Sequence, residues 1–354
     1  MVAIVGVLTF PLMYEALVDT FGRTVRDLRI SVTDRCNFRC TYCMPEEGME
    51  WLRRDEVLTF EEIERVARLC VERFGVNSIR LTGGEPTVRA HLPVLVAKLA
   101  ALRVNGAEHG RPGEAGGVDL SMTTNGATLR LLADDLYQAG LRRLNISCDS
   151  LRRERFLAIT KRDQLDAVMG GIDAAVKAGF HPVKLNCVLM RGINDDEVVD
   201  FARFGRERGV NVRFIEFMPL DAPDQWAASR VVPGAEIVAA IDAVFPLEPS
   251  GGRGSEPAER YRYLDGGGEV GVIASVSEPF CGACDRVRLT AEGQMRNCLF
   301  AVDETDLRVI LRGGGSDDDL AAAMAANVAR KWAGHSINQI NFTRPARSMS
   351  QIGG

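Results

Sequence analysis

Short apolar strands that alternate with helices are the feature that most limits the fold of this 354-residue chain. Six strand–helix cycles follow one another, with strands expected at residues 28–32, 78–82, 118–123, 142–147, 182–189 and 212–217. This alternation predicts parallel strands joined by crossover helices. The expected fold class is therefore α/β: a partial (β/α)6 barrel resembling a TIM barrel, followed by a C-terminal α+β extension.

The composition of the sequence changes beyond Met218, where proline, glycine and charged residues become frequent. Further on we expect helices over residues 235–245 and 317–332 and strands near 261–264 and 270–276. The predicted units are a weakly structured apolar tail (1–22), the partial barrel (23–220) and a C-terminal domain (221–354). The Gly-rich stretch 105–117 reads as a surface insertion.

Polar and glycine-rich motifs recur where the expected strands end. They are Gly83-Gly84-Glu85-Pro86, Thr124-Asn125-Gly126, Cys148-Asp149-Ser150 and Met218-Pro219. Barrel enzymes place their active sites at the carboxyl ends of the strands. The motifs therefore predict an active site at that end of the barrel.

Three cysteines follow the first strand with the spacing C-x3-C-x2-C, at Cys36, Cys40 and Cys43. Thiolates suit zinc or an iron–sulfur cluster, and both normally require four ligands. Since neither a fourth cysteine nor a histidine is nearby, one coordination position would stay open, which favours chemistry over structure. A zinc knuckle, or three unrelated buried thiols, are the alternatives. Cys70, on the apolar side of a predicted helix, is expected to be a core residue.

This spacing, with Tyr42 before the last cysteine, resembles the signature of the radical S-adenosylmethionine (SAM) enzymes. The resemblance implies that Cys36, Cys40 and Cys43 hold a [4Fe–4S] cluster whose open iron binds SAM. These enzymes also share the partial-barrel architecture.

A second cysteine set, Cys281, Cys284 and Cys298, has the spacing C-x2-C-x13-C and again shows only three thiols. Between them, Arg286 and Arg288 would share one face of a strand. Paired guanidinium groups suit phosphate or carboxylate oxygens. The alternatives are a zinc ribbon that lacks one ligand and a solvated strand face.

The two sets together resemble one branch of the radical SAM enzymes, the MoaA family of molybdenum cofactor biosynthesis, from about Arg23 to the last residue. The motifs that carry the resemblance are DRCNFRCTYCMP, RLTGGEPTVR, TTNG, LNISCDS, RFIEFMPL, CGACDRVRLT, RNCLF and the terminal GG. The chain departs from the pattern in its apolar tail, its 105–117 insertion and Cys148. None of these touches a ligand position.

The resemblance implies a site for each cofactor and substrate. Cys281, Cys284 and Cys298 would hold a second [4Fe–4S] cluster, approached by the guanine of GTP. SAM would contact Tyr42, Gly83, Gly84, Glu85, Ser147, Asp149 and Met218. GTP would contact Arg29, Arg80, Thr123, Lys184, Arg213, Arg286 and Arg288, with Asn125 nearby and Gly353 and Gly354 entering the cavity.

The positions of four of these basic residues support an anion site independently. Arg29 and Arg80 lie on the first two expected strands, and Lys184 and Arg213 lie on the last two. A charge inside an apolar barrel strand is costly unless it meets an anion.

The implied reaction begins with a 5′-deoxyadenosyl radical that takes the 3′ hydrogen of the GTP ribose. Attack on C8 of guanine then gives (8S)-3′,8-cyclo-7,8-dihydroguanosine 5′-triphosphate. The expected partners are GTP, a second copy of the chain, a flavodoxin, ferredoxin or reductase as electron donor, and the cyclic pyranopterin monophosphate synthase (MoaC).

Composition restricts the setting. A net charge of −5 argues against nonspecific nucleic-acid binding. Nine cysteines, an odd number in two tight clusters, do not resemble a secreted disulfide framework. We therefore expect a cytoplasmic protein without DNA or membrane partners. Two other functions stay open: a peptide-modifying radical SAM enzyme and a non-catalytic zinc-binding module. Iron and sulfide content after anaerobic purification would separate the zinc module from the enzymes.

Overall fold

The computed structural model describes residues 15–45, 49–107, 114–221, 226–337, 339–340 and 342–353. Its centre is one twelve-stranded sheet with the order β12-β11-β10-β1-β2-β3-β4-β5-β6-β9-β8-β7. The first six strands pair in parallel. They are β1 (Asp27–Ser31), β2 (Ser78–Thr82), β3 (Asp119–Thr124), β4 (Arg143–Ser147), β5 (Val183–Leu189) and β6 (Asn211–Glu216).

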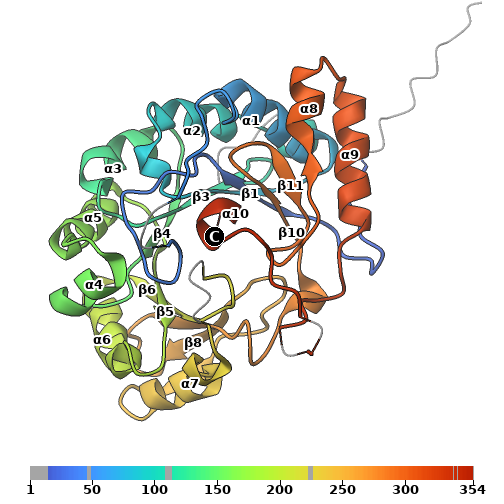
Figure 1. Ribbon diagram of the computed structural model, residues 1–354. Coiled ribbons are helices and arrows are strands. Elements are labelled where there is room, and N and C mark those ends of the chain that lie inside the picture. The colour runs from blue at the N-terminus through green and yellow to red at the C-terminus, as the bar shows by residue number, and fades with distance from the viewer. Residues whose placement is uncertain are drawn as a thin grey trace, which may run out of the picture.

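Helices cover the outside of this curved sheet, and the strands surround the centre of the view in Figure 1. They are α1 (Phe60–Arg68), α2 (Leu92–Ala100), α3 (Leu129–Gln138), α4 (Arg153–Thr160), α5 (Leu165–Ala178) and α6 (Val198–Arg208). The first begins as its sequence predicts, because Thr59 and Glu62 form a capping box. Apolar residues of the strands and helices form one large core that includes Ile30, Leu81 and Phe214.

The C-terminal part of the chain extends the sheet at both edges. On one side, β10 (Arg286–Leu289) pairs in parallel with β1, followed by β11 (Gln294–Arg296) and β12 (Thr305–Asp306). On the other, β9 (Glu269–Ile273) pairs in parallel with β6, followed by β8 (Glu259–Tyr263) and β7 (Leu247–Pro249). The expected α/β fold with a partial barrel is confirmed, and eight of its strands run in parallel.

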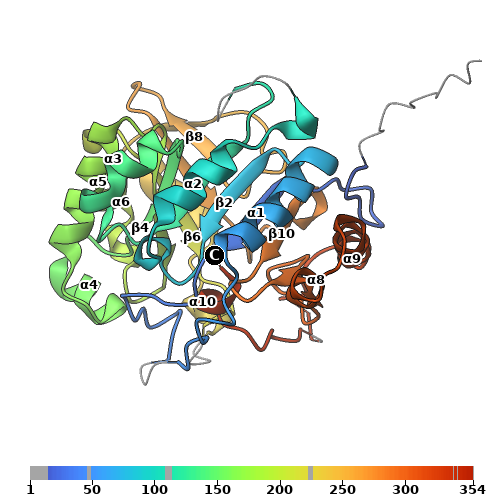
Figure 2. The same cartoon turned by 90° about the horizontal axis from the view of Figure 1, so that it is seen from above.

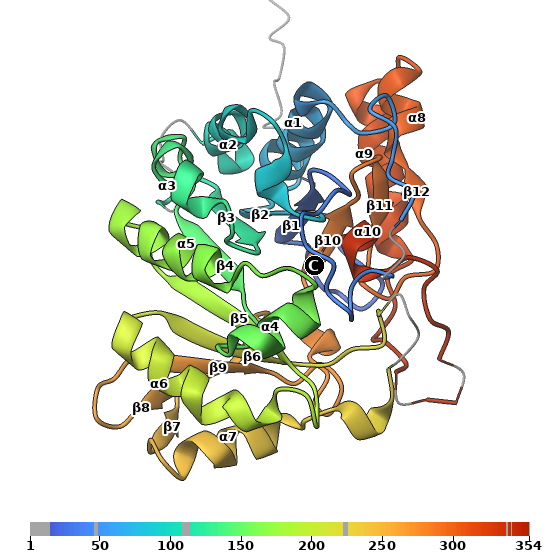
Figure 3. The same cartoon turned by 60° about the vertical axis from the view of Figure 1, so that its left-hand side comes forward.

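The remaining helices flank these edges. Figure 3 shows α8 (Leu307–Arg312) and α9 (Asp317–Ala329) beside β11 and β12, while α7 (Gly234–Asp242) lies on the opposite side with β7 and β8. The last helix, α10 (Met349–Ile352), lies over the middle of the barrel in Figures 1 and 2.

Several boundaries differ from expectation. The sequence prediction omitted α4, β7, β11, β12, α8 and α10, which are mostly too short to show a clear period. The predicted helix 317–332 ends at Ala329. Leu17 is buried and Val18 pairs with Thr24, so packing extends further towards the N-terminus than the predicted boundary at residue 22. The rest of the tail and much of the 105–117 insertion lie outside the described residues.

A search of the described residues for long apolar helices finds none with the length and hydropathy of a membrane span.

Candidate functional site

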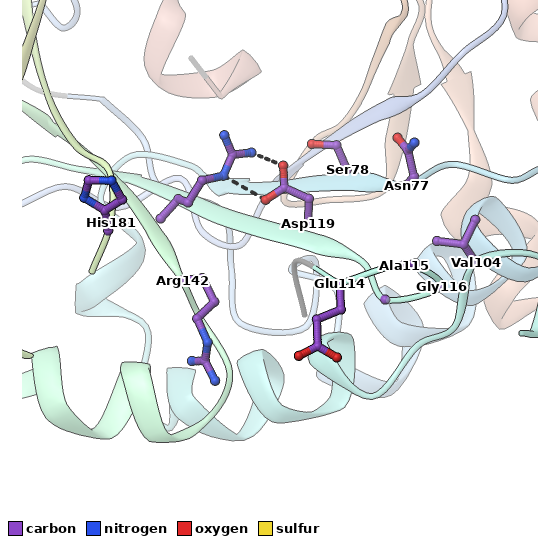
Figure 4. Close-up of a pocket in the computed structure, with 11 residues that line it drawn as sticks. Asn77, Ser78, Val104, Glu114, Ala115, Gly116, Asp119, Arg142 and His181 are labelled. Carbon is purple, nitrogen blue, oxygen red and sulfur yellow. Dashed lines mark hydrogen bonds and ion pairs between the residues drawn. The ribbon is translucent and has the colours of Figure 1, made fainter. Parts of the chain in front are cut away.

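Two cavities lie at opposite ends of the barrel. The larger, about 770 Å³, lies among the first residues of the strands and is shown in Figure 4. Its charges are mixed, and Asp119 there accepts hydrogen bonds from Arg143. The smaller, about 260 Å³, lies inside the barrel towards the carboxyl ends of the strands, and most of the predicted site residues line it. We therefore place the candidate site in the smaller cavity.

Cations cover one wall of this cavity. Arg288, Arg29 and Arg80 are register neighbours on β10, β1 and β2, so their side chains lie at one level on one face. Burial and the neighbouring Arg80 charge lower the pKa of Arg29 to about 9. Burial and the charges of Arg29 and Arg286 lower the pKa of Arg288 to about 9 as well. Three adjacent guanidinium groups repel one another, and an anion between them would remove that repulsion.

The opposite strands contribute two more cations. Arg213 lines the cavity from β6. Lys184 on β5 does not line the cavity, although it is one of the basic residues that the sequence predicted for the GTP site. Burial and the charges of Arg213 and Arg143 lower the pKa of Lys184 to about 7. Lys184 is therefore a charged neighbour of Arg213 and not part of the cavity lining.

All three cysteines of the second set line the cavity. Cys281 begins a short 3-10 turn, and Cys298 follows β11. Burial acts to raise the pKa of Cys284, but the charges of Arg286 and Lys331 lower it to about 7. Burial raises the pKa of Cys281. Buried Nη2 of Arg286 has no hydrogen-bond partner within the described residues. Three thiols beside an unsatisfied cation fit a cluster that receives an anionic ligand.

The first cysteine set lies on a loop after β1 that α4 holds in place. The backbone amides of Arg39 and Thr41 donate to the carbonyls of Thr160 and Ile159, at 3.0 and 2.9 Å. Burial raises the pKa of the Cys36 thiol to about 11 and that of Cys43 to about 12. Thiols in such surroundings are deprotonated when metal supplies the missing positive charge.

The spacing of the sulfurs bears on the kind of metal centre. Across the described ranges of the chain, no three Cys, His, Asp or Glu side chains already converge on one point as the ligands of a single ion do. A multi-iron cluster takes each thiolate at a different iron, whereas a single zinc ion takes all of its ligands itself.

The glycine motif after β2 lies directly against the cysteine loop. Gly84 and Glu85 donate their amides to the carbonyls of Thr33 and Arg35, both at 2.8 Å. A Cβ on Gly84 would lie 2.3 Å from the Arg35 oxygen, so glycine is required there. This contact explains why the motif follows the strand next to the cysteine loop.

Glu85 itself points away from the cavity. Its buried carboxylate accepts hydrogen bonds from Thr87, Thr124 Oγ1 (2.6 Å) and the amide of Asn125 (2.6 Å). Asn125 in turn donates to Asn37 Oδ1 at 2.7 Å, within the cysteine loop. The Glu85 side chain therefore organises the strand ends, and neither Glu85, Gly83, Gly84 nor Asn125 lines the cavity.

The remaining predicted SAM residues line the cavity, whereas the first cysteine set does not: the lining residues are Tyr42, Ser147, Asp149 and Met218, and Thr123 lines the cavity as well. The Tyr42 hydroxyl donates to Asp149 Oδ2 at 2.7 Å. Burial raises the pKa of Asp149 to about 6, and the pKa of Tyr42 well above its usual range.

The C-terminal tail enters the mouth of the barrel. Gly353 has a left-handed φ of 81°, and a Cβ there would lie 2.4 Å from Ser31 Oγ and 2.5 Å from Thr82 Oγ1. The Gly353 oxygen lies 3.5 Å from Nη1 of Arg288. Gly354 lies outside the described residues.

Sequence reasoning missed several residues that the structure brings to the site. Asn186 on β5, Phe280, Asn297 and His335 line the cavity. The buried Oδ1 of Asn186 has no hydrogen-bond partner in the part of the chain that the structure describes. A polar residue in an apolar strand was a signal that could have identified Asn186. Phe280, stacked 4.9 Å from the Arg286 guanidinium, gave no such signal.

Comparisons with known proteins agree with this geometry. The family model for the Radical SAM superfamily matches residues 30–205, and the model for Molybdenum Cofactor Synthesis C matches residues 210–337. A GTP 3′,8-cyclase of Mycobacterium sp. (strain KMS) is 50% identical over 339 residues, 96% of this chain and 93% of the relative. One from Corynebacterium glutamicum (strain R) is 46% identical over 346 residues, 96% of this chain and 90% of the relative.

Among solved structures, Streptococcus suis SuiB bound to S-adenosylmethionine has a TM-score of 0.58 at 11% identity, covering 92% of this chain and 77% of that one. This likeness concerns the fold alone. The two curated relatives extend over nearly the whole chain and match both cysteine regions. The chain therefore belongs to the GTP 3′,8-cyclase family of radical SAM enzymes.

Proposed function

We propose that this chain converts GTP to (8S)-3′,8-cyclo-7,8-dihydroguanosine 5′-triphosphate, the first step of molybdenum cofactor biosynthesis. One observation carries the proposal. The second cysteine set, three register-paired arginines and Tyr42, which adjoins Cys43 of the first set, all face a single cavity. A nucleotide that spans this cavity would be in reach of both metal centres.

The two cysteine sets fit two [4Fe–4S] clusters, each with one open iron. Cys36, Cys40 and Cys43 would hold the first cluster, which with SAM bound would supply the radical chemistry needed at the 3′ position of the ribose. Tyr42, Ser147, Asp149 and Met218 line the cavity, and Tyr42 directly precedes Cys43 in the sequence. We assign them to SAM binding, with Gly83, Gly84 and Glu85 shaping the wall behind it.

The protein's own part is to bind, orient and enclose the nucleotide. Arg29, Arg80 and Arg288 would hold the triphosphate, because hydrogen bonds between a guanidinium and phosphate are strong and fixed in direction. Arg286 and Arg213 complete the basic lining, with Lys184 behind it and Thr123 near the ribose. The tail at Gly353 covers the mouth and excludes water from the reacting centre.

We further propose the division into a barrel (23–220) and a C-terminal domain (221–354). The second cluster and most guanine contacts would belong to the latter. The protein would work in the cytoplasm as a homodimer, and a small reductase, flavodoxin or ferredoxin would supply electrons. Its product would pass to a cyclic pyranopterin monophosphate synthase of the MoaC kind.

The decisive experiment is an anaerobic incubation of the reconstituted protein with SAM, GTP and a strong reductant. We expect 5′-deoxyadenosine and a cyclised nucleotide in equal amounts, detected by chromatography and mass spectrometry. Formation of 5′-deoxyadenosine without any GTP-derived product would contradict the assignment and favour another radical SAM reaction.

Variants of the basic wall test the substrate site. Arg286→Ala and Arg288→Ala should lower nucleotide conversion by roughly 10- to 150-fold while slow SAM cleavage persists, since each removes charged hydrogen bonds worth about 1.5–3 kcal/mol. Arg262→Ala is the matched control, because Arg262 lies exposed on β8 and pairs with Glu248 on β7. Full turnover by either cavity variant would refute the phosphate role.

A further inference from the structure

A short segment after α9 contacts every part of the second cysteine set. We name residues 331–335 the strap. The strap supplies no cysteine and belongs to neither cysteine motif. It nevertheless reaches Cys281 through Gly334 and His335, and the Cys284 and Cys298 arms through Lys331.

Lys331 is the buried residue of the strap, with only 4% of its surface exposed. Its Nζ donates to the backbone oxygen of Arg286 at 2.6 Å and to that of Asn297 at 2.7 Å. Arg286 lies two residues after Cys284, and Asn297 directly precedes Cys298. One ammonium group therefore joins the two arms that carry these cysteines.

The surroundings of Lys331 leave its charge without an acidic partner. No carboxylate forms an ion pair with Nζ within the described ranges of the chain. The favourable charges nearby are those of Cys284 and Cys298, whereas Arg23 and Arg286 oppose the ammonium. Burying an ammonium is costly unless an anion compensates for it. The thiolates of the second set are the anions that this position offers.

Contacts at the other end of the strap fix its path. Arg23 donates hydrogen bonds to the backbone oxygens of Cys281 (2.6 Å) and Ala333 (2.9 Å). It therefore connects the strap to the 3-10 turn that begins at Cys281. A Cβ on Gly334 would lie 3.1 Å from the Cβ of Cys281, so the two backbones approach closely. His335 Nε2 lies 2.9 Å from the oxygen of Ser275. These contacts hold Lys331 at a fixed place relative to the thiols.

We propose that Lys331 is a positioning residue of the second cluster, an inference that rests on the proposed function. It holds the Cys284 and Cys298 arms at a fixed separation and places an ammonium group beside the cluster. Nearby charge and hydrogen bonding tune the reduction potential of such clusters. Because a cation stabilises the more negative, reduced form, Lys331 raises the potential of the second cluster.

The test uses the full chain with Cys36, Cys40 and Cys43 replaced by alanine, so that only the second cluster can form. Lys331→Met removes the charge at similar length, and Lys331→Arg keeps it. Lys177→Met, on the exposed side of α5, controls for a change of net charge. Iron and sulfide per chain are measured after anaerobic reconstitution, and the midpoint potential is measured by EPR-monitored titration.

We expect Lys331→Arg to retain the cluster. Lys331→Met should either lose it or hold it at a more negative potential. The expected shift is at least tenfold in the ratio of oxidised to reduced cluster at fixed potential, or about 59 mV for one electron. Loading of Lys331→Met at the unchanged potential, equal loss in both Lys331 variants, or an equal shift in Lys177→Met would overturn the proposal. Neither readout needs GTP, so failure here is distinct from failure of the proposed reaction.

Discussion

The two cysteine sets have the same number of thiols but opposite electrostatic surroundings. Beside the first set lie acids: burial, Asp149 and the neighbouring thiols raise the pKa of Cys40 well above its usual range. Beside the second set lie cations, and Arg286 and Lys331 outweigh burial to lower the pKa of Cys284. Burial alone therefore does not decide the state of a thiol in this barrel.

The difference indicates what each metal centre would receive. An acidic environment suits a cationic ligand, and SAM carries a sulfonium and an amino group. A basic environment suits an anion, and the three register-paired arginines line the same cavity as the second set. The two cysteine sets therefore differ in the charge of the side chains beside them.

Removal of one thiol from each set should give the largest effect. Cys43→Ser should abolish both SAM cleavage and GTP conversion, because the first cluster loses a ligand. Cys284→Ser should abolish GTP conversion but leave 5′-deoxyadenosine formation measurable. Iron content and the two products, measured in parallel, check this. Loss of both products in Cys284→Ser would show that the two centres are not functionally separate.

A smaller effect is expected from a substitution in the C-terminal tail, which enters the mouth of the barrel. Gly353→Ala places a methyl group against Ser31 and Thr82 and should push the tail out of the mouth, so GTP conversion falls at least tenfold. Gly251→Ala is the matched control, because its φ of 79° is equally unfavourable for alanine but a Cβ there would meet nothing within 4 Å. Each change should cost about 1 kcal/mol of stability, measured by thermal unfolding. Equal activity in both variants would show that the position of the tail does not matter.

The smallest effect concerns the pH dependence of GTP binding, to which Lys184 should contribute. The pKa of Lys184 in the free protein is about 7, and a bound triphosphate favours the charged form. GTP binding should therefore weaken as pH rises through 7, by at most about tenfold per pH unit. Lys184→Arg keeps its charge, so its KM for GTP should change less between pH 6.5 and 8.5. The same pH slope in both proteins would remove Lys184 from the substrate site.

Local patterns predicted the barrel well. The second strand, 78–82, and the helix over 165–178 match β2 and α5 at both ends, because turn residues and caps bound them clearly. Cys70 is buried in the core, as its helical position indicated. The register that aligns Arg288, Arg29 and Arg80 depends on pairing between residues far apart in the chain, which no local pattern encodes.

The site could be predicted only where it depends on motifs. Cys281, Cys284 and Cys298 carry their spacing in the sequence, and all three face the cavity. Lys331 carries no motif, and its role follows only from the fold, which places it 45 residues from Arg286 but 2.6 Å from its oxygen. Glu85 shows the converse. It lies in a clear motif, yet its carboxylate accepts hydrogen bonds from Thr124 and Asn125 and does not line the cavity.

The position of α10 and Gly353 at the mouth of the barrel has a practical consequence. Ile352 and Gly353 are buried, and Ser350 forms a hydrogen bond with the Cys43 thiol, so α10 and Gly353 lie closely packed at the mouth of the barrel. Any residues that follow Gly353 must leave through that mouth or displace α10. A chain cut before α10 would keep the barrel and both cysteine sets, yet its cavity would stay open to water.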